Sequence, residues 1–315
     1  MFLVVILVCL LIPGSIAYFI SGDSLILQFD LQYFLQFLNS YVSFDLGIPI
    51  PGYSLDIPLI YCCISISFLI HWIIFIPSFL NKTEKFYDFT GMVAYLSVIG
   101  FALYQKNKIL GSIDFDSALL GILISVWTLR LGIFLFYRVF KVGEDDRFKE
   151  VKQVPSKFLI WFTVSGLWVS LTSIAALKVL TSQVEHNNYY FVYLGLALWI
   201  FGFLFEVIAD YQKTKFKNNP ENKDQFISSG LWSLSRHPNY FGEIILWIGI
   251  FIITIPSLSG IDYLTILSPL FVYTLLNKVS GINLLEIKAQ SKWGNLDSYK
   301  QYRKRTPQLI PKFWN

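Results

Sequence analysis

The sequence has few charged residues and, from Met1 to Asn81, no lysine or arginine at all. Charged residues make up 15% of the 315 positions, hydrophobic residues make up 55%, and the mean hydropathy is +0.55. A soluble domain of this size does not need so much apolar surface. The composition therefore predicts a protein that crosses the membrane several times. Because a cleaved signal peptide begins with basic residues, the first apolar run, Phe2–Ile20, is expected to be a retained span.

Cysteine is also scarce. The three cysteines, Cys9, Cys62 and Cys63, all lie in apolar runs, which argues against disulfides and a zinc site and favours buried thiols. The chain has no G-x-G-x-x-G segment after a strand, so a Rossmann domain is excluded as a nucleotide site. It also has no internal repeat, low-complexity tract or soluble second domain. The sequence predicts no metal site and no nucleic-acid partner, and it leaves the oligomeric state open.

Long apolar stretches predict an all-α fold, a polytopic transmembrane helical bundle of about eight spans. The last two stretches are short and bounded by Pro256 and Pro269, which suggests a tilted or hairpin-like pair. The expected spans are Phe2–Ile20, Ile57–Leu80, Thr90–Tyr104, Leu119–Phe140, Phe158–Leu180, Tyr190–Ala209, Glu243–Ile255 and Tyr263–Asn277.

Lysine and arginine are distributed unevenly between the two sides of this bundle. If the spans alternate, the 81–88 loop, the 138–157 loop, the 211–242 segment and the C-terminal tail share one side and carry 21 of the 25 basic residues. By the positive-inside rule this side is cytoplasmic, and the C-terminus with it. The segment between the first two spans is acidic and aromatic. It is expected at the outer face, with Asp30–Leu38 along the membrane interface.

A dense polar cluster, SRHPNYFGE at positions 235–243, runs directly into an apolar segment. Its proline suits the first turn of a helix, where the missing N–H costs nothing. Arg236, Asn239 and Glu243 are three and four residues apart and so share one helical face. Tyr240 can take the place of Asn239 on that face. Polar groups at the edge of lipid are costly unless they bind something, so this face is the first candidate site.

Two arginines lie near the end of the expected fourth span. Arg130 precedes Arg138 by about two turns, so both project from a similar face. Arg138 either reaches the interface as a snorkelling side chain or takes part in a site. A guanidinium in mid-span, as at Arg130, is expected to face a polar cavity. The mixed charges that follow at 143–148 are either a solvated loop cap or part of the site.

Acidic and basic side chains follow one another along the exit of the sixth span. Glu206 and Asp210 are four residues apart on one face, and Lys213 and Lys217 continue that stripe into the cytoplasm. A juxtamembrane stop signal accounts for the lysines but not for two acids at the bilayer edge. Such a helix suits a ligand with a polar head and phosphates.

The C-terminal tail is basic and aromatic. It contains Glu286 and then the segment 299–306, in which Tyr299 and Tyr302 alternate with basic residues that include Arg303. These basic side chains bind either anionic lipid headgroups or the phosphates of a nucleotide, and the sequence does not decide between the two. In the second case the tyrosines supply stacking surface.

These segments together resemble one known family. Gly230-Leu231-Trp232, the 235–243 segment, the upstream Leu-Phe-Tyr-Arg and the Tyr-x-x-Tyr … Ile-Pro tail look like the steroid 5-alpha-reductase-like family, in particular its bacterial branch of domain-of-unknown-function 1295 proteins. The resemblance covers roughly residues 90–315, which are expected to form the catalytic domain, after an N-terminal membrane region at residues 1–89. An isolated R-H-P-x-Y is less specific, since isoprenylcysteine and phospholipid methyltransferases carry it too.

This resemblance implies a membrane fold that holds NADPH in a cytoplasmic-side cavity and reduces an activated carbon–carbon double bond. Position by position, Asn239 and Glu243 match family residues that contact the nicotinamide end of the cofactor. Asp210 and Lys217 match an acidic and a basic residue on the cofactor-facing helix, and Arg138 matches a phosphate-side arginine. The further side chains expected at the cofactor are Arg236, Glu206, Tyr299, Tyr302 and Arg303.

Two departures weaken the link to steroids. Glu206 stands where steroid-reducing members have Asn. Those members also polarise the substrate ketone with a Glu in an early span and a Tyr three residues before the Arg138 position. Here no Glu precedes Glu84, and the tyrosine position is Leu135. Cofactor binding is therefore better supported than steroid specificity.

Hydride transfer to an enone also needs a hydrogen-bond or proton donor at the carbonyl, to stabilise the developing enolate. Tyr137, Tyr240 and His71 are the catalytic candidates. His71 is the intramembrane histidine of the apolar first half of the sequence. A packed or interhelically bonded histidine is the alternative interpretation for it.

The leading hypothesis is an integral, multi-pass NADPH-dependent reductase whose lipid-like or steroid-like substrate enters from the bilayer. One alternative is an S-adenosylmethionine-dependent methyltransferase of lipid or isoprenylcysteine type. That alternative expects a pair of acids after a basic residue in the last helix, and Glu286 alone supports it poorly. Another is a non-catalytic lipid-binding relative, which the missing early-span Glu allows and the Asn239/Glu243 pair argues against.

Overall fold

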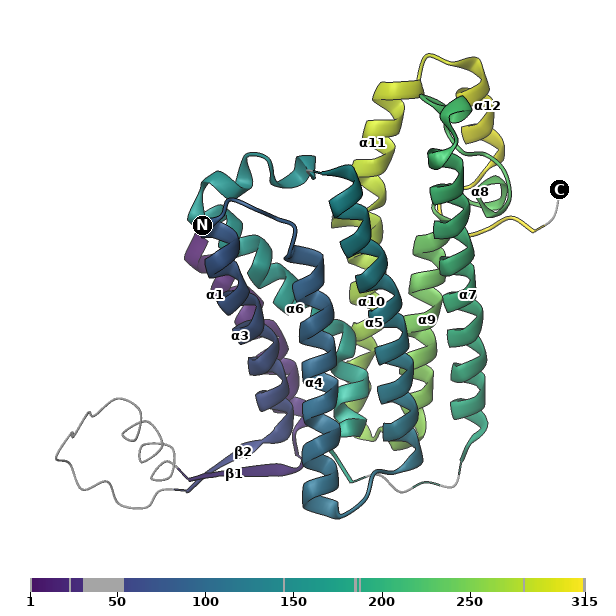
Figure 1. Cartoon of the computed structure of the whole chain (residues 1–315). Coiled ribbons are helices and arrows are strands. Elements are labelled where there is room, and N and C mark those ends of the chain that lie inside the picture. The colour runs from purple at the N-terminus through teal and green to yellow at the C-terminus, as the bar shows by residue number, and fades with distance from the viewer. Residues whose placement is uncertain are drawn as a thin grey trace. The chain divides into compact units, whose positions relative to one another are not determined.

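The computed structural model describes residues 2–22, 24–30, 54–143, 145–183, 186, 188–279 and 281–313. Within these ranges almost all regular structure is helical (Figure 1). The main elements are α1 (Phe2–Ile20), β1 (Ile26–Asp30), β2 (Ser54–Pro58), α3 (Leu59–Leu80), α4 (Tyr87–Leu110), α5 (Phe115–Val142), α6 (Pro155–Leu180), α7 (Tyr190–Asn218), α8 (Leu231–Leu234), α9 (Pro238–Thr254), α10 (Leu267–Thr274), α11 (Ile282–Trp293) and α12 (Asp297–Arg305).

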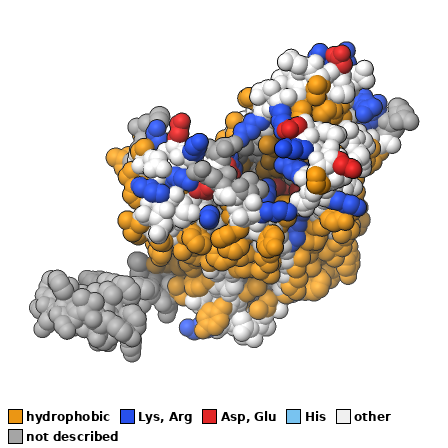
Figure 2. Space-filling model, turned by 45° about the horizontal axis from the view of Figure 1, so that its top comes forward, with side chains coloured by type: hydrophobic (Ala, Val, Ile, Leu, Met, Phe, Trp, Pro, Cys, Tyr) orange, Lys and Arg blue, Asp and Glu red, His pale blue; other side chains and the backbone are white. Residues whose placement is uncertain are grey.

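The predicted membrane spans are confirmed. Among the described residues, eight helical segments are long and apolar enough to cross a membrane. Large hydrophobic side chains are exposed on their flanks, for example Leu3 on α1, Ile73 on α3 and Leu204 on α7. Figure 2 shows that hydrophobic side chains cover much of the visible surface of the helices. This is the architecture of a helical multi-pass membrane protein, in which every span satisfies its own backbone hydrogen bonds.

The last two spans differ in detail from the expectation. α9 begins at Pro238 rather than at Glu243, so the polar motif lies in the first turns of the helix. The final span is not one regular helix. A 3-10 segment at Gly260–Ile266 leads into α10, and a π-helical turn at Leu275–Val279 follows it. Such turns leave the regular hydrogen-bond ladder and often occur at functional sites.

A short antiparallel ladder joins the segments after α1 and before α3. Ile26 of β1 lies opposite Pro58 of β2, and Asp30 lies opposite Ser54. The interfacial segment expected at Asp30–Leu38 lies, beyond its first residue, outside the described residues.

The chain divides into two compact units. The N-terminal unit comprises Met1–Ser170 with Leu177–Val184, and the C-terminal unit comprises Leu171–Ala176 with Glu185–Asn315. The division expected between residues 89 and 90, which separates a membrane region from a catalytic domain, stays a prediction.

In the N-terminal unit, aromatic side chains fix the loop between α5 and α6. Phe148 of this loop is buried, and its ring centre lies 4.8 Å from that of Tyr87 and 5.0 Å from that of Trp161. The cluster continues through the edge contacts of Phe158 and Phe162. Because aromatic rings bury much area and prefer such tilted contacts, this cluster anchors the loop to α4 and α6.

Two lysines of this unit have buried ammonium groups. Lys106 is 1% exposed, pairs with Asp114 and donates to the Val179 carbonyl at 3.0 Å. Lys178 is 2% exposed and donates to the Ile20 carbonyl at 2.9 Å. Each lysine thus satisfies a carbonyl in the last turn of a helix, where no intrahelical partner is available. Both charges are held inside the protein.

Replacing Lys106 with methionine is expected to lower the free energy of unfolding by about 2 kcal/mol, because removing one member of a buried ion pair leaves the other charge uncompensated. The 26% exposure of Asp114 limits the loss. Thermal unfolding in detergent measures the effect. Lys108→Met is the matched control, since Lys108 is exposed two residues further along α4. Equal unfolding midpoints for the two variants would contradict this account.

In the C-terminal unit, α7 and α9 lie side by side (Figure 1) and their backbones touch. Gly195 and Gly202 of α7 face Gly249 and Gly242 of α9. A Cβ atom added at Gly242 would lie 2.6 Å from the Glu206 nitrogen, and one added at Gly202 would lie 2.5 Å from the Gly242 carbonyl oxygen. Small residues at such contacts let transmembrane helices approach closely. This approach brings the polar residues of the two helices together.

Candidate functional site

A cluster of buried polar side chains lies at the contact between α7 and α9. Glu206 and Asp210 of α7 are 2% and 7% exposed, and Glu243 of α9 is 7% exposed. Asn239, one turn before Glu243, donates from Nδ2 to Asp210 Oδ1 at 3.2 Å. We call these four residues the α7–α9 polar cluster. Ionisable groups with so little exposure are costly unless they are paired or bind a ligand.

The proline takes the helix-start position that the sequence predicts, but Arg236 lies before α9 and does not share a helical face with Asn239 and Glu243. His237 precedes the helix with φ −136°, and Pro238 takes the first helical position, where no N–H is needed. The Tyr240 ring stacks on the His237 ring, with centres 5.9 Å apart and planes at 12°. Asn239 and Tyr240 therefore both lie in the first turn of α9, next to His237.

Glu286 of α11 gathers three neighbouring side chains. Its Oε2 lies 2.9 Å from Arg236 Nη1 and 3.6 Å from Arg303 Nη2, and its Oε1 lies 3.0 Å from His237 Nε2. Burial lowers the pKa of His237 below its ordinary value, although the Glu286 carboxylate acts in the opposite direction. At neutral pH a neutral imidazole with its proton on Nε2 therefore donates to Glu286.

The Arg236 guanidinium has unused donors. The side chain is 12% exposed, and its Nε and Nη1 atoms are buried without a hydrogen-bond partner among the described residues. The contact of Nη1 with Glu286 is an ion pair that lacks hydrogen-bond geometry. Buried donors without partners cost free energy, and a phosphate or carboxylate near the guanidinium would relieve that cost.

The C-terminal tail holds the segment before α9 in place. The Arg236 N–H donates to the Pro307 carbonyl at 2.9 Å, and the Ser235 hydroxyl donates to the Leu309 carbonyl at 2.7 Å. The backbone of the polar motif therefore depends on the last residues of the chain for its position.

Tyr299 and Tyr302, predicted to stack on a cofactor, are 3% and 4% exposed. Their ring centres lie 5.0 and 5.4 Å from that of Phe226, and the Tyr302 hydroxyl donates to the Trp232 carbonyl at 2.7 Å. Burial raises the pKa of both phenols. The rings thus take part in the packing of α12 instead of forming an open stacking surface, and their contact with a cofactor stays a prediction.

Two lysines follow the polar cluster along α7. Lys213 Nζ lies 4.7 Å from the centre of the Trp232 ring. Lys217 is exposed in the last turn of the helix. Because α7 continues beyond the expected end of its span to Asn218, the acids and the lysines share one continuous helix, as their spacing predicts.

His71 belongs to the N-terminal unit and is fully buried. Its Nδ1 lies 2.7 Å from the Ser67 carbonyl of the same helix, and its Nε2 lies 2.9 Å from Ser165 Oγ of α6. These contacts are those of an interhelically bonded histidine, the alternative interpretation of this residue. Its catalytic role stays a prediction.

Arg130, Tyr137 and Arg138 lie on α5 of the same unit. The guanidinium carbons of Arg130 and Arg138 lie 5.5 and 6.0 Å from the centre of the Phe134 ring, so the two arginines share a face of the helix. Arg138 is exposed, and Tyr137 is 75% exposed. The phosphate contact of Arg138 and the substrate contact of Tyr137 stay predictions.

The loop after α5 is tied to its surroundings by ion pairs. Glu84 pairs with Lys152 at 2.8 Å and accepts the Asp145 N–H at 3.0 Å. Burial raises the pKa of Asp145, but the Arg147 guanidinium outweighs this effect and holds the pKa below its ordinary value. These contacts favour the loop-cap interpretation of segment 143–148, of which Glu144 lies outside the described residues. The sequence gives no signal that singles out the Glu84–Lys152 pair.

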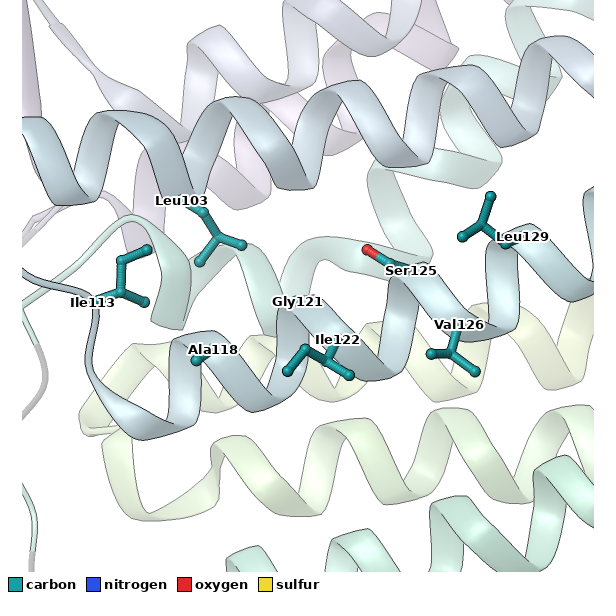
Figure 3. A pocket seen from close by; sticks show the side chains of 8 residues that line it. All are labelled: Leu103, Ile113, Ala118, Gly121, Ile122, Ser125, Val126 and Leu129. Carbon is teal, nitrogen blue, oxygen red and sulfur yellow. The ribbon is translucent and has the colours of Figure 1, made fainter.

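An apolar groove of about 410 Å³ lies in the N-terminal unit, between α4 and α5 (Figure 3). None of the predicted site residues lines it. Its lining is almost wholly apolar, which suits contact with lipid. The lining residues are Leu103, Ile113, Ala118, Gly121, Ile122, Ser125, Val126 and Leu129.

One contact of the candidate site escapes prediction from the sequence. The sequence marks Glu286 only as a weak sign of a methyltransferase, yet its carboxylate is the common partner of Arg236, His237 and Arg303. The signal in the sequence that could have identified Glu286 is a single acid on a helix that precedes a basic tail.

Among the described residues, no group of three or more His, Cys, Asp or Glu side chains is arranged to hold a metal ion.

The spans and the polar groups at the start of α9 define a helical multi-pass membrane protein with a candidate ligand site in its C-terminal unit. A family model described as protein of unknown function (DUF1295) matches residues 74–306, and the chain therefore belongs to this family. The branch expected from the motifs is thereby confirmed, whereas the wider relation to steroid 5-alpha-reductases still rests on the motif resemblance. No curated protein matches the chain.

Proposed function

We propose that the protein is a membrane-embedded, NADPH-dependent reductase of an activated carbon–carbon double bond in a lipid-like or steroid-like substrate. The observation that carries this proposal is the hydrogen bond between Asn239 and Asp210, within a cluster whose other members, Glu206 and Glu243, are also buried. The motif resemblance implies cofactor contacts at these residues. Arg236 and Lys217 belong to the same unit, and a dinucleotide requires such basic side chains for its phosphates.

The side chains of the C-terminal unit fit the chemical parts of NADPH. The amide and carboxylates of the α7–α9 polar cluster suit a carboxamide and ribose hydroxyls, which both donate and accept hydrogen bonds. Arg236, Arg303 and Lys217 suit phosphates, for which arginine offers a planar fork of donors. Arg236 Nε and Nη1 are buried without a hydrogen-bond partner, which supports an anionic ligand at this end of the site.

NADPH held by these residues would supply a hydride to the β-carbon of the activated double bond. Negative charge then develops on the conjugated carbonyl, where a hydrogen-bond donor must stabilise it until the α-carbon takes up a proton. Of the three predicted donors, Tyr240 lies in the same unit as the polar cluster, and its ring is held against His237. We assign to its hydroxyl the role of orienting and polarising the carbonyl.

The site is proposed to face the cytoplasm, together with the C-terminus. The support for this orientation is the excess of lysine and arginine in the loops of that side. A lipid-like substrate would approach from the bilayer, since the spans expose apolar flanks.

No observation favours the methyltransferase alternative. It expects a pair of acids after a basic residue in the last helix, whereas Glu286 is a single acid whose carboxylate is engaged by Arg236, His237 and Arg303. A lipid-binding protein without catalysis is the other possible outcome of the experiment below.

Deuterium transfer tests the proposal even though the substrate is unidentified. Purified protein in detergent is incubated with NADPH that carries deuterium at both C4 positions and with a lipid extract from the source membrane. Mass spectrometry then measures the deuterium content of the lipids. We expect carbon-bound deuterium in one lipid class, and none with Asn239→Ala. Methyl transfer from S-adenosylmethionine without deuterium transfer, or NADPH binding with no labelled lipid, would contradict the reductase.

A further inference from the structure

We infer that Glu286 is a positioning residue, which holds Arg236 and His237 in the orientation in which the start of α9 binds the cofactor. This inference rests on the proposed function and adds a residue to it. Glu286 would act through its neighbours, because its contacts are with Arg236, His237 and Arg303 instead of the α7–α9 polar cluster.

The first support is the convergence of three elements on one carboxylate. Arg236 and His237 come from the segment before α9, Glu286 comes from α11, and Arg303 comes from α12. Glu286 is 15% exposed, Arg236 12% and the His237 side chain 7%. At such low exposure solvent screens the pair little, so losing the carboxylate leaves an uncompensated guanidinium. Arg303, 41% exposed and 3.6 Å away, contributes less.

The second support is that different groups hold the backbone and the side chains of the segment before α9. The tail already holds the backbone of this segment, through the Arg236 N–H and the Ser235 hydroxyl. Glu286 adds the orientation of two side chains, which these backbone contacts leave free to rotate. Side chains with fixed rotamers lose less entropy when a ligand binds, and this favours affinity.

The third support is the short path from Glu286 to the polar cluster. The Glu286 carboxylate contacts the His237 ring, and the His237 ring stacks on Tyr240. Asn239 immediately precedes Tyr240 in the chain and bonds to Asp210. A change at Glu286 therefore reaches the proposed carbonyl donor through one intermediate side chain, and it reaches the proposed nicotinamide contact through the residue next to that donor.

The competing role for Glu286 is a purely structural link between α11 and the motif. The two roles differ in what they change. A structural link changes the unfolding temperature but leaves the affinity of the folded protein unaltered. A positioning residue changes affinity, and it does so only while the side chains that it positions are present.

A double-mutant cycle separates the two roles. NADPH affinity and the thermal unfolding midpoint are measured in detergent for the wild type, Glu286→Gln, Arg236→Gln and the double variant. Asp262→Asn is the matched control, since Asp262 is a buried acid of the same unit that caps the 3-10 segment at Ser259. Glu286→Asp, which keeps the negative charge, is the rescue variant.

We expect Glu286→Gln to weaken NADPH binding about 10-fold, the size of one lost charge-assisted interaction. In the Arg236→Gln background the same change should have little further effect, and Glu286→Asp should recover part of the affinity. Asp262→Asn should bind like the wild type. Unchanged affinity of Glu286→Gln, or effects that add fully in the double variant, would overturn the positioning role alone. Failure of the wild type to bind NADPH would overturn the proposed function and this inference with it.

Discussion

Replacing Asn239 with alanine is expected to weaken NADPH binding about 100-fold while the protein stays folded. The change removes the amide that bonds to Asp210 at 3.2 Å and that is proposed to contact the nicotinamide end of the cofactor. It also leaves a carboxylate that is 7% exposed without this hydrogen bond. Hydrogen bonds to charged groups contribute about 1.5–3 kcal/mol each, and about 1.4 kcal/mol corresponds to a tenfold change in affinity. A titration in detergent measures the loss.

Asn283→Ala is the control for this prediction. Asn283 is an exposed asparagine of the same unit whose amide donates to the Lys278 carbonyl at 2.9 Å. Its removal should leave the affinity unchanged. Glu243→Ala should match Asn239→Ala in its loss of binding. If Asn239→Ala and Glu243→Ala bound NADPH like the wild type, the cofactor would not lie at the α7–α9 polar cluster.

Replacing Gly242 with alanine is expected to lower the free energy of unfolding by about 3 kcal/mol or more, the upper range for overpacking a close contact. A Cβ atom at Gly242 would lie 2.6 Å from the Glu206 nitrogen and 2.6 Å from the Gly202 oxygen. Both are backbone atoms, which cannot move aside as a side chain does. The two helices would have to separate along part of their contact, and the polar cluster would open with them.

Gly100→Ala is the matched control, because a Cβ atom at Gly100 of α4 would meet no atom within 4 Å. Alanine favours a helix over glycine by about 1 kcal/mol, so this variant should unfold at the same temperature or slightly higher. Gly242→Leu extends the series and should not yield folded protein. An unfolding midpoint for Gly242→Ala equal to that of Gly100→Ala would show that α7 and α9 are not in backbone contact.

The spans were predictable because each is a continuous apolar run that can be recognised without its packing partners. Their ends were less predictable. α4 continues to Leu110, past the expected end at Tyr104, although Lys106 lowers the local hydropathy. Its ammonium group is neutralised by Asp114 inside the protein, a pairing that hydropathy does not register. α7 runs beyond its apolar part because a helix does not have to end where the membrane does.

The shared faces of the candidate site were predictable for a similar reason. Helical periodicity alone places Glu206 with Asp210 and Asn239 with Glu243. The contact between the two pairs was not predictable, since it depends on close backbone approach at Gly202 and Gly242. Spacing in sequence carries no information about contacts between distant helices.

Residue type alone did not decide between the two interpretations of the tail. Tyr299 and Tyr302 among basic residues suit a nucleotide, but the same composition suits a self-packed aromatic cluster, and both rings lie around Phe226. For Glu286 the sequence suggests too little instead of too much. One acid 49 positions after His237 gives no local pattern, yet its carboxylate lies 3.0 Å from that imidazole. Ion pairs between separate elements are fixed by the folded structure and leave little trace in the sequence.

We propose that this membrane protein binds NADPH through the start of α9. The most direct test of this proposal is a binding titration of the purified wild-type protein in detergent, with NADPH and with S-adenosylmethionine in parallel. We expect saturable binding of NADPH and no binding of S-adenosylmethionine. Binding of S-adenosylmethionine alone, or of neither compound, would contradict the proposal.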